Sequence, residues 1–111
     1  MKVPPWSAVI LLVAMAQPLR AEGDAERGLA VARQVCSACH AIQAHQLQSP
    51  NERAPTFLAL ATTPGMTATA LTVALTTPHA GMPMFRLTAE QQDGIIAYIG
   101  SLKKSGSPPG R

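Results

Sequence analysis

The run Cys36-Ser37-Ala38-Cys39-His40 decides how this chain folds. Residues three and four apart share one face of a helical turn, so the two thiols can point at a single planar ligand. His40 follows directly, so its side chain can lie under the centre of that planar molecule. A neutral imidazole coordinates iron well. In an exported chain this C-x-x-C-H pattern indicates covalent haem attachment, with thioether bonds from Cys36 and Cys39.

Three other chemistries use paired cysteines. A zinc site takes about four ligands, usually from two such pairs, but the chain has two cysteines, and His45 and His79 lack zinc-ligand spacing. A thioredoxin-like motif needs a βαβ context, and no stretch of this chain alternates as a strand does. A structural disulfide between the two cysteines stays open, although it would not require His40.

The first 21 residues have the pattern of a secretory signal peptide. Lys2 supplies the positive charge, residues 6–16 form the apolar run, and Ala21 is the small residue before the expected cleavage point. The apolar run is too short to cross a bilayer, which takes about 20 residues. We therefore expect a cleaved signal, no membrane anchor afterwards, and a periplasmic protein, since haem thioethers form outside the bacterial cytoplasm.

Composition limits the function of the remaining chain. We expect one domain over residues 22–104 and a disordered tail, rich in Gly, Pro and Ser, over 105–111. Loss of Lys2 and Arg20 with the signal leaves seven basic residues against six acidic ones. With so small an excess of positive charge, we expect no basic patch that could bind nucleic acid. The sequence also shows no nucleophile–base pair and no second metal site, so we expect no enzymatic activity.

The first helix is expected over residues 25–36, with Asp24 as its N-cap. Gly28 lies in its interior, where glycine costs roughly 1 kcal/mol relative to alanine. A glycine at such a position indicates that another backbone or a large side chain comes close to the helix.

Three further helices are expected, over residues 57–60, 68–76 and 89–103. Thr67 can cap the second of these, and Thr88 begins a capping box at the third. Apolar residues on the last helix recur at i, i+3, i+4 and i+7, which predicts one buried stripe. The stripe consists of Ile95, Tyr98, Ile99 and Leu102.

A methionine can supply the second axial ligand of a haem iron, and a His/Met pair raises the reduction potential. Met66, Met82 and Met84 remain once the signal is removed. Met82 lies between Gly81 and Pro83, where the backbone is constrained, and this favours it as the ligand. The alternative is that the methionines only fill the core.

From Gly28 to Leu102 the chain resembles the class I, monohaem bacterial cytochromes c. The resemblance rests on Gly28, the C-x-x-C-H run, the loop at 82–85 and the last helix at 95–99. It implies an all-α fold in which the first and last helices cross, with Gly28 against Tyr98, while short helices wrap one covalently bound haem c. It also implies that His40 and Met82 are the axial ligands.

The resemblance extends to the loop after the motif. It implies that a proline carbonyl accepts a hydrogen bond from the proximal histidine, and Pro55 is the best match. Arg53-Ala54-Pro55 with Phe57 also resembles a subgroup of short alphaproteobacterial-type cytochromes. Arg53 and Pro55 are therefore expected at the cofactor.

The function that the resemblance implies is transfer of single electrons in the periplasm by a monomer. Its partners would be redox proteins, met transiently through a small interface. A haem domain that binds or senses small ligands, with an open sixth position, is one alternative. A cytochrome subunit of a periplasmic dehydrogenase is another, since it would need the same residues.

Overall fold

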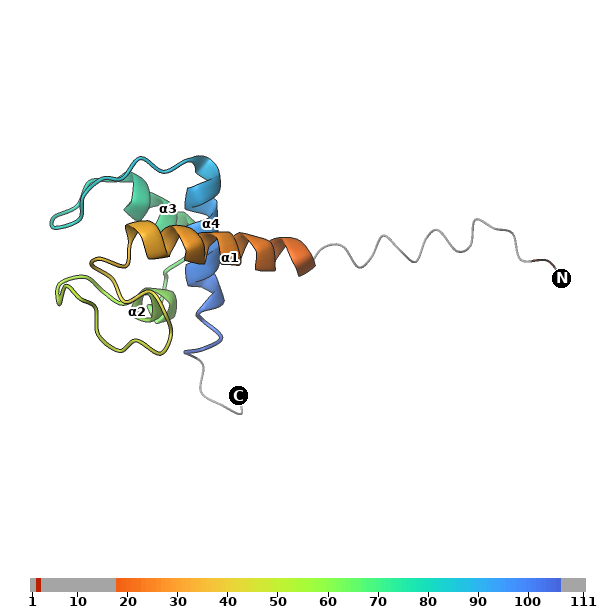
Figure 1. The fold of residues 1–111 in the computed structure, drawn as a ribbon, viewed down its shortest axis with the longest axis horizontal. Coiled ribbons are helices and arrows are strands. Elements are labelled where there is room, and N and C mark those ends of the chain that lie inside the picture. Colours follow the sequence, from red (N-terminus) through yellow and green to blue (C-terminus); the bar gives the residue numbers. More distant parts are fainter. Residues whose placement is uncertain (1, 3–17, 107–111) are drawn as a thin grey trace.

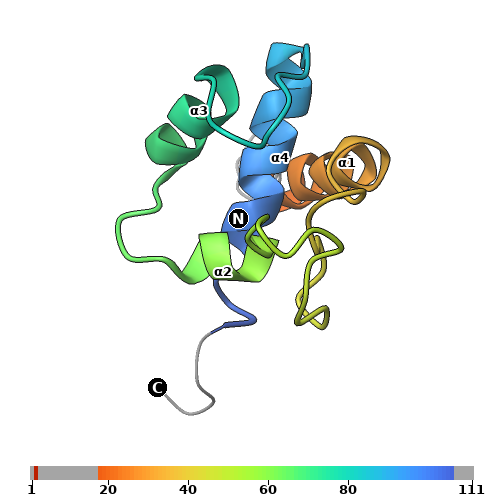
Figure 2. The ribbon, with the colours of Figure 1, turned by 90° about the vertical axis from the view of Figure 1, so that its left-hand side faces the viewer.

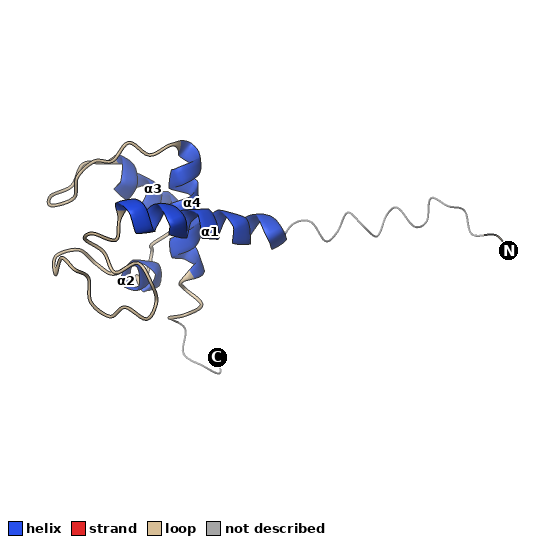
Figure 3. Cartoon of the chain, in the orientation of Figure 1, coloured by secondary structure: helices blue, strands red, loops and turns tan. Residues whose placement is uncertain are grey.

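The computed structural model describes residue 2 and residues 18–106, and this part of the chain is built from helices joined by long loops (Figure 3). It contains no strand, only an isolated antiparallel bridge between His79 and Met82. The all-α prediction is confirmed. The helices, in chain order, are α1 (Pro18–Val35), α2 (Phe57–Thr62), α3 (Ala68–Thr76) and α4 (Ala89–Ser101) (Figure 1).

Threonine side chains begin the last three helices. The hydroxyl of Thr67 accepts a hydrogen bond from the N–H of Ala70 at 3.1 Å, as predicted for the cap of α3. Thr88 and Gln91 form the predicted capping box at α4, with reciprocal bonds of 3.0 and 3.1 Å. Thr56 caps α2 in the same way. A hydroxyl acceptor satisfies an N–H that a helix start would leave unpaired, which fixes these boundaries.

The predicted start of α1 is wrong. The helix begins at Pro18 rather than after Asp24, and it ends at Val35. Proline is tolerated in a first helical turn because its missing N–H would have no partner there. Asp24 lies inside the helix instead, where its carboxylate forms an ion pair with Arg27 one turn later.

Helices α1 and α4 cross and make the most extensive contact between helices in the described chain (Figures 1 and 2). At the crossing, Gly28 lies against the backbone of α4. A Cβ atom on Gly28 would lie 1.8 Å from the carbonyl oxygen of Gly94 and 2.9 Å from the nitrogen of Ile95. The prediction that another backbone approaches Gly28 is thus confirmed.

The residue that faces Gly28 most closely is Gly94, one turn before the expected Tyr98. Tyr98 is buried, and its hydroxyl donates a 2.6 Å hydrogen bond to the carbonyl oxygen of Ile42 in the loop after the motif. A crossing this close leaves room for two glycine backbones but not for a ring. The tyrosine therefore packs beside the crossing and ties α4 to the loop.

The core lies between α1, α4 and the shorter helices. It includes the whole predicted stripe of α4, which confirms that prediction. The buried apolar residues are Ala32, Cys36, Ala41, Ile42, Phe57, Ala61, Leu71, Ile95, Tyr98, Ile99 and Leu102.

The predicted signal peptide falls largely outside the described residues, and its last four residues, 18–21, belong to α1. Of the predicted tail, Ser105 and Gly106 form a turn whose N–H groups donate to the carbonyl of Leu102. Residues 107–111 also lie outside the described part. Within that part, none of the helices combines the length and apolar character that crossing a bilayer would need.

Candidate haem site

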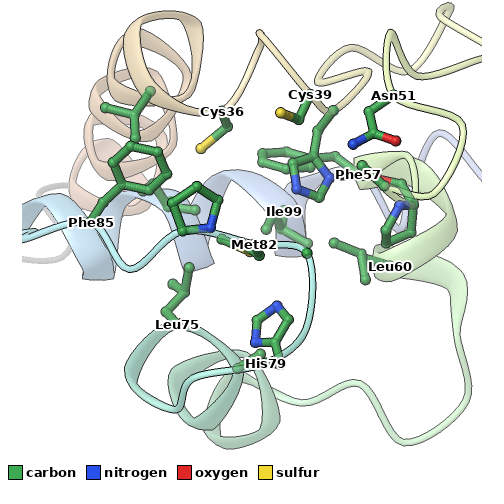
Figure 4. A pocket seen from close by; sticks show the side chains of 18 of the residues that line it. Cys36, Cys39, Asn51, Phe57, Leu60, Leu75, His79, Met82, Phe85 and Ile99 are labelled. Carbon is green, nitrogen blue, oxygen red and sulfur yellow. Dashed lines mark hydrogen bonds between the residues drawn. The ribbon is translucent and has the colours of Figure 1, made fainter.

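A cavity of about 500 Å³ opens between the end of α1, the loop after it, and the loop between α3 and α4 (Figure 4). Its walls are mostly apolar, with Leu60, Leu71, Leu75, Ile95 and Ile99 supplied by the helices. Every residue that the sequence predicted at the cofactor lines this cavity: Cys36, Cys39, His40, Arg53, Pro55 and Met82.

The two cysteines lie on a turn that continues α1. The N–H of Cys36 donates to Ala32 at 2.9 Å, and the N–H groups of Cys39 and His40 both donate to the carbonyl of Cys36, at 3.1 and 2.9 Å. This winding brings both sulfur atoms to the same wall of the cavity (Figure 4). The two cysteines form no disulfide with each other, so both sulfur atoms can bond to a ligand in the cavity.

His40 is held by the carbonyl of Pro55. The ring Nδ1 lies 2.7 Å from the Pro55 oxygen, which can only accept, so Nδ1 is the donor, and in the neutral ring Nε2 has the lone pair. Ligating histidines in metalloproteins usually make such a bond, because it fixes the tautomer and the ring orientation. Pro55 thus lies where the resemblance implies it.

Backbone contacts position that loop. The N–H of Asn51 donates to the carbonyl of Cys39 at 3.1 Å, and the N–H of Phe57 donates to that of Ala41 at 2.9 Å. The side chain of Asn51 also accepts from the N–H of Arg53 at 3.0 Å. Arg53 and Pro55 therefore lie on a loop whose two ends are hydrogen-bonded to the motif and to the residue directly after it.

Phe57 is a site residue that sequence reasoning did not assign. Its ring centroid lies 5.5 Å from that of His40 and 6.3 Å from that of Tyr98, with both ring pairs tilted. Tilted contacts at such distances are favourable for aromatic rings. Phe57 therefore connects the candidate iron ligand to the stripe of α4, a relation that sequence spacing does not reveal.

The three methionines occupy different environments. Met82 lines the cavity and is half-buried, whereas Met84 is 50% exposed and does not line it. Met66 also lines the cavity but packs against the hydrophobic core. Gly81 precedes Met82 with φ of 84°, a conformation that glycine adopts readily, and it turns the loop so that Met82 reaches the cavity.

Two histidines remain. His45 is exposed and lies outside the cavity lining. His79, for which the sequence suggested no role, lines the cavity, and its ring points inward (Figure 4). No group of three or more His, Cys, Asp or Glu side chains that could hold a metal ion by themselves occurs in the described part of the chain.

These residues fit a haem. Two thiols and an oriented imidazole with a free Nε2 come from one segment, and a soft thioether comes from another, across an apolar cavity. Thioether and imidazole are the axial pair of cytochromes c, and apolar surroundings suit the macrocycle. Cys36 and Cys39 would form the thioether bonds, and His40 and Met82 would hold the iron.

Comparison with known proteins shows the family to which the chain belongs. Residues 23–99 match the family model described as cytochrome c oxidase, cbb3-type, subunit III. Cytochrome c-552 of Bradyrhizobium diazoefficiens is 32% identical over 95 residues, which cover 86% of this chain and 90% of that protein. No solved structure matches. The helical fold, the motif and these matches identify a protein with covalently bound haem c, and the chain belongs to the class I, monohaem family of bacterial cytochromes c.

Proposed function

We propose that this cytochrome shuttles single electrons between redox proteins in the periplasm, with His40 and Met82 as the axial ligands. The family to which it belongs transfers electrons through haem. The observation that carries the finer proposal is the placement of an oriented His40 imidazole and the Met82 thioether on the same cavity. With His40 and Met82 both holding the iron, the protein would need little rearrangement between the two redox states.

The chain's residues have separate tasks in this proposal. Haem, when bound, supplies the one-electron couple. The Pro55 carbonyl orients His40 and increases the basicity of Nε2. The Met82 thioether, as a soft ligand, would favour the reduced iron and raise the potential. Cys36 and Cys39 would bind the haem covalently, just after the end of α1.

The proposal includes a signal peptide cleaved after Ala21, a monomeric mature protein and transient partners. Small, weak interfaces are the usual form of electron-transfer contacts. The matched family model is named for a subunit of a cytochrome oxidase, so an oxidase is the first acceptor to test.

Spectroscopy of two methionine variants tests the axial assignment. Met82→Ala should lose the weak sulfur-to-iron band of the ferric protein and lower the reduction potential. Met84→Ala is the matched control, because Met84 is half exposed and outside the cavity lining. It should keep both the band and the potential. Loss of the band in Met84→Ala, with retention in Met82→Ala, would reverse the assignment. A wild-type protein with high-spin ferric iron would favour the ligand-binding function instead.

A further inference from the structure

A second imidazole lines the cavity, that of His79, which lies in the loop between α3 and α4 and is exposed to solvent on its other side. Its Nδ1 lies 3.1 Å from the carbonyl oxygen of Thr77. Since a carbonyl only accepts, Nδ1 is the donor, and in the neutral ring Nε2 has the lone pair, as in His40. A backbone carbonyl behind one ring nitrogen and a free second nitrogen is the usual arrangement of a ligating histidine. Both histidines that line the cavity have it.

The backbone holds Thr77 in the position that this bond needs. Thr77 ends α3 with extended angles, φ −112° and ψ 129°, and its N–H donates to the carbonyl of Val73 at 2.9 Å. Pro78 follows, and a proline disfavours helical angles in the residue before it. The carbonyl acceptor of His79 is therefore set by the end of the helix and not by a freely moving loop.

His79 and Met82 are also paired across a tight turn. They form an isolated antiparallel bridge, and the N–H of Met82 donates to the carbonyl of His79 at 3.4 Å. Directly opposed residues of an antiparallel pair project from the same face, with Cβ atoms about 5 Å apart. The imidazole and the thioether therefore leave the same side of one turn, toward the same cavity (Figure 4).

We infer that His79 is a reserve axial ligand, which takes the iron position when Met82 leaves it. Once Met82 no longer held the iron, His79 would hold it through Nε2 from the same side of the cavity. The imidazole remains neutral with its proton on Nδ1, and no electron is transferred. The inference rests on the proposed His40/Met82 ligation and goes beyond it. Its consequence is that loss of Met82 does not leave the site open to small ligands.

The test uses holoprotein in which Met82 is replaced. Ferric Met82→Ala should remain low-spin without the sulfur band, because His79 ligates. Met82→Ala/His79→Ala should become high-spin, and cyanide should bind to it on the order of tenfold faster or more, since no imidazole competes for the position. Met82→Ala/His45→Ala is the matched control and should behave like Met82→Ala, because His45 lies outside the cavity lining.

Met82→Ala/His79→Gln, which keeps a polar side chain at position 79, repeats the test with a second replacement. Equal spin state and equal cyanide rates for Met82→Ala and either of the His79 double variants would overturn the inference. The wild-type sulfur band tests the His40/Met82 proposal separately. That proposal therefore fails on a different measurement from the one that decides the role of His79.

Discussion

Gly28 is the residue at which one added carbon atom should change stability most directly. A methyl group there would meet the backbone of Gly94, which has no flexible side chain to move away, so α1 and α4 must separate. Overpacking typically costs about 1–3 kcal/mol, and because the added atom meets backbone that cannot move aside, we expect the cost to exceed the roughly 1 kcal/mol that alanine gains over glycine in a helix. Gly28→Ala should therefore lower the midpoint of urea denaturation.

Gly100→Ala is the control for helix propensity. Gly100 is exposed on α4, and a Cβ atom there would meet nothing within 4 Å. This variant should gain up to about 1 kcal/mol and raise the midpoint. If the denaturation midpoint rises as much for Gly28→Ala as for Gly100→Ala, then α1 and α4 do not cross at Gly28 and Gly94.

A second prediction at the level of single residues concerns the two cysteines. Cys36→Ala/Cys39→Ala removes both candidate attachment sulfurs, and the chain has no other cysteine. Denaturing gel electrophoresis followed by haem staining should show a strong band for wild type and little for the double variant. A fully stained double variant would rule out thioether attachment through these residues.

Residue types and spacing indicated several residues of the cavity lining, but not the contacts between segments that form only on folding. The C-x-x-C-H run and the Gly81-Met82-Pro83 constraint indicated residues that line one cavity. His79 and Phe57 were not assigned, because their placement depends on a turn and on ring packing between distant segments.

Among the elements, α4 is tied to the loop after the motif by the hydrogen bond from Tyr98 to the carbonyl of Ile42. Tyr98→Phe keeps the ring but leaves that buried acceptor without its donor, which costs roughly 1–3 kcal/mol. The denaturation midpoint should fall by a corresponding amount. An unchanged midpoint would show that water replaces the hydroxyl at no cost.

The same hydrogen bond should make the stability of the fold depend on pH, and the direction of that dependence can be derived. Burial raises the pKa of the Tyr98 hydroxyl, an effect that Arg33 partly offsets. The protonated hydroxyl therefore stabilises the fold. This stabilisation is complete below the ordinary tyrosine pKa of about 10, and it is lost as the pH rises through the higher pKa of the folded state. The stability difference between wild type and Tyr98→Phe should shrink in that alkaline range. A difference that widens there would contradict the raised pKa.

Helix starts were predictable where a side chain fixes them. Thr67 and Thr88 satisfy backbone N–H groups locally, so α3 and α4 begin at the predicted residues. The start of α1 was not predictable from Asp24, because a residue able to cap can equally form an ion pair inside a longer helix. Sequence at one position did not distinguish these roles.

At the scale of the molecule, a haem in the cavity would supply much of the apolar core that a small domain needs. Few large side chains are buried completely in the described part; Ile95 is the largest. Small domains often need a cross-link or bound group to be stable, in addition to their apolar core. Here the covalently bound haem would have that role. Protein produced without haem should show little helix by circular dichroism and no cooperative unfolding. A haem-free protein with the holoprotein's helix content would contradict this dependence.

The measurement that tests the central claim most directly is a redox titration of the purified holoprotein, followed by its optical spectrum. An electron carrier with His40 and Met82 bound in both states should give one reversible one-electron step. Both end states should be low-spin, and the reduced form should not bind carbon monoxide. A high-spin reduced form that binds carbon monoxide at once would show an open sixth position and contradict the proposed electron-carrier function.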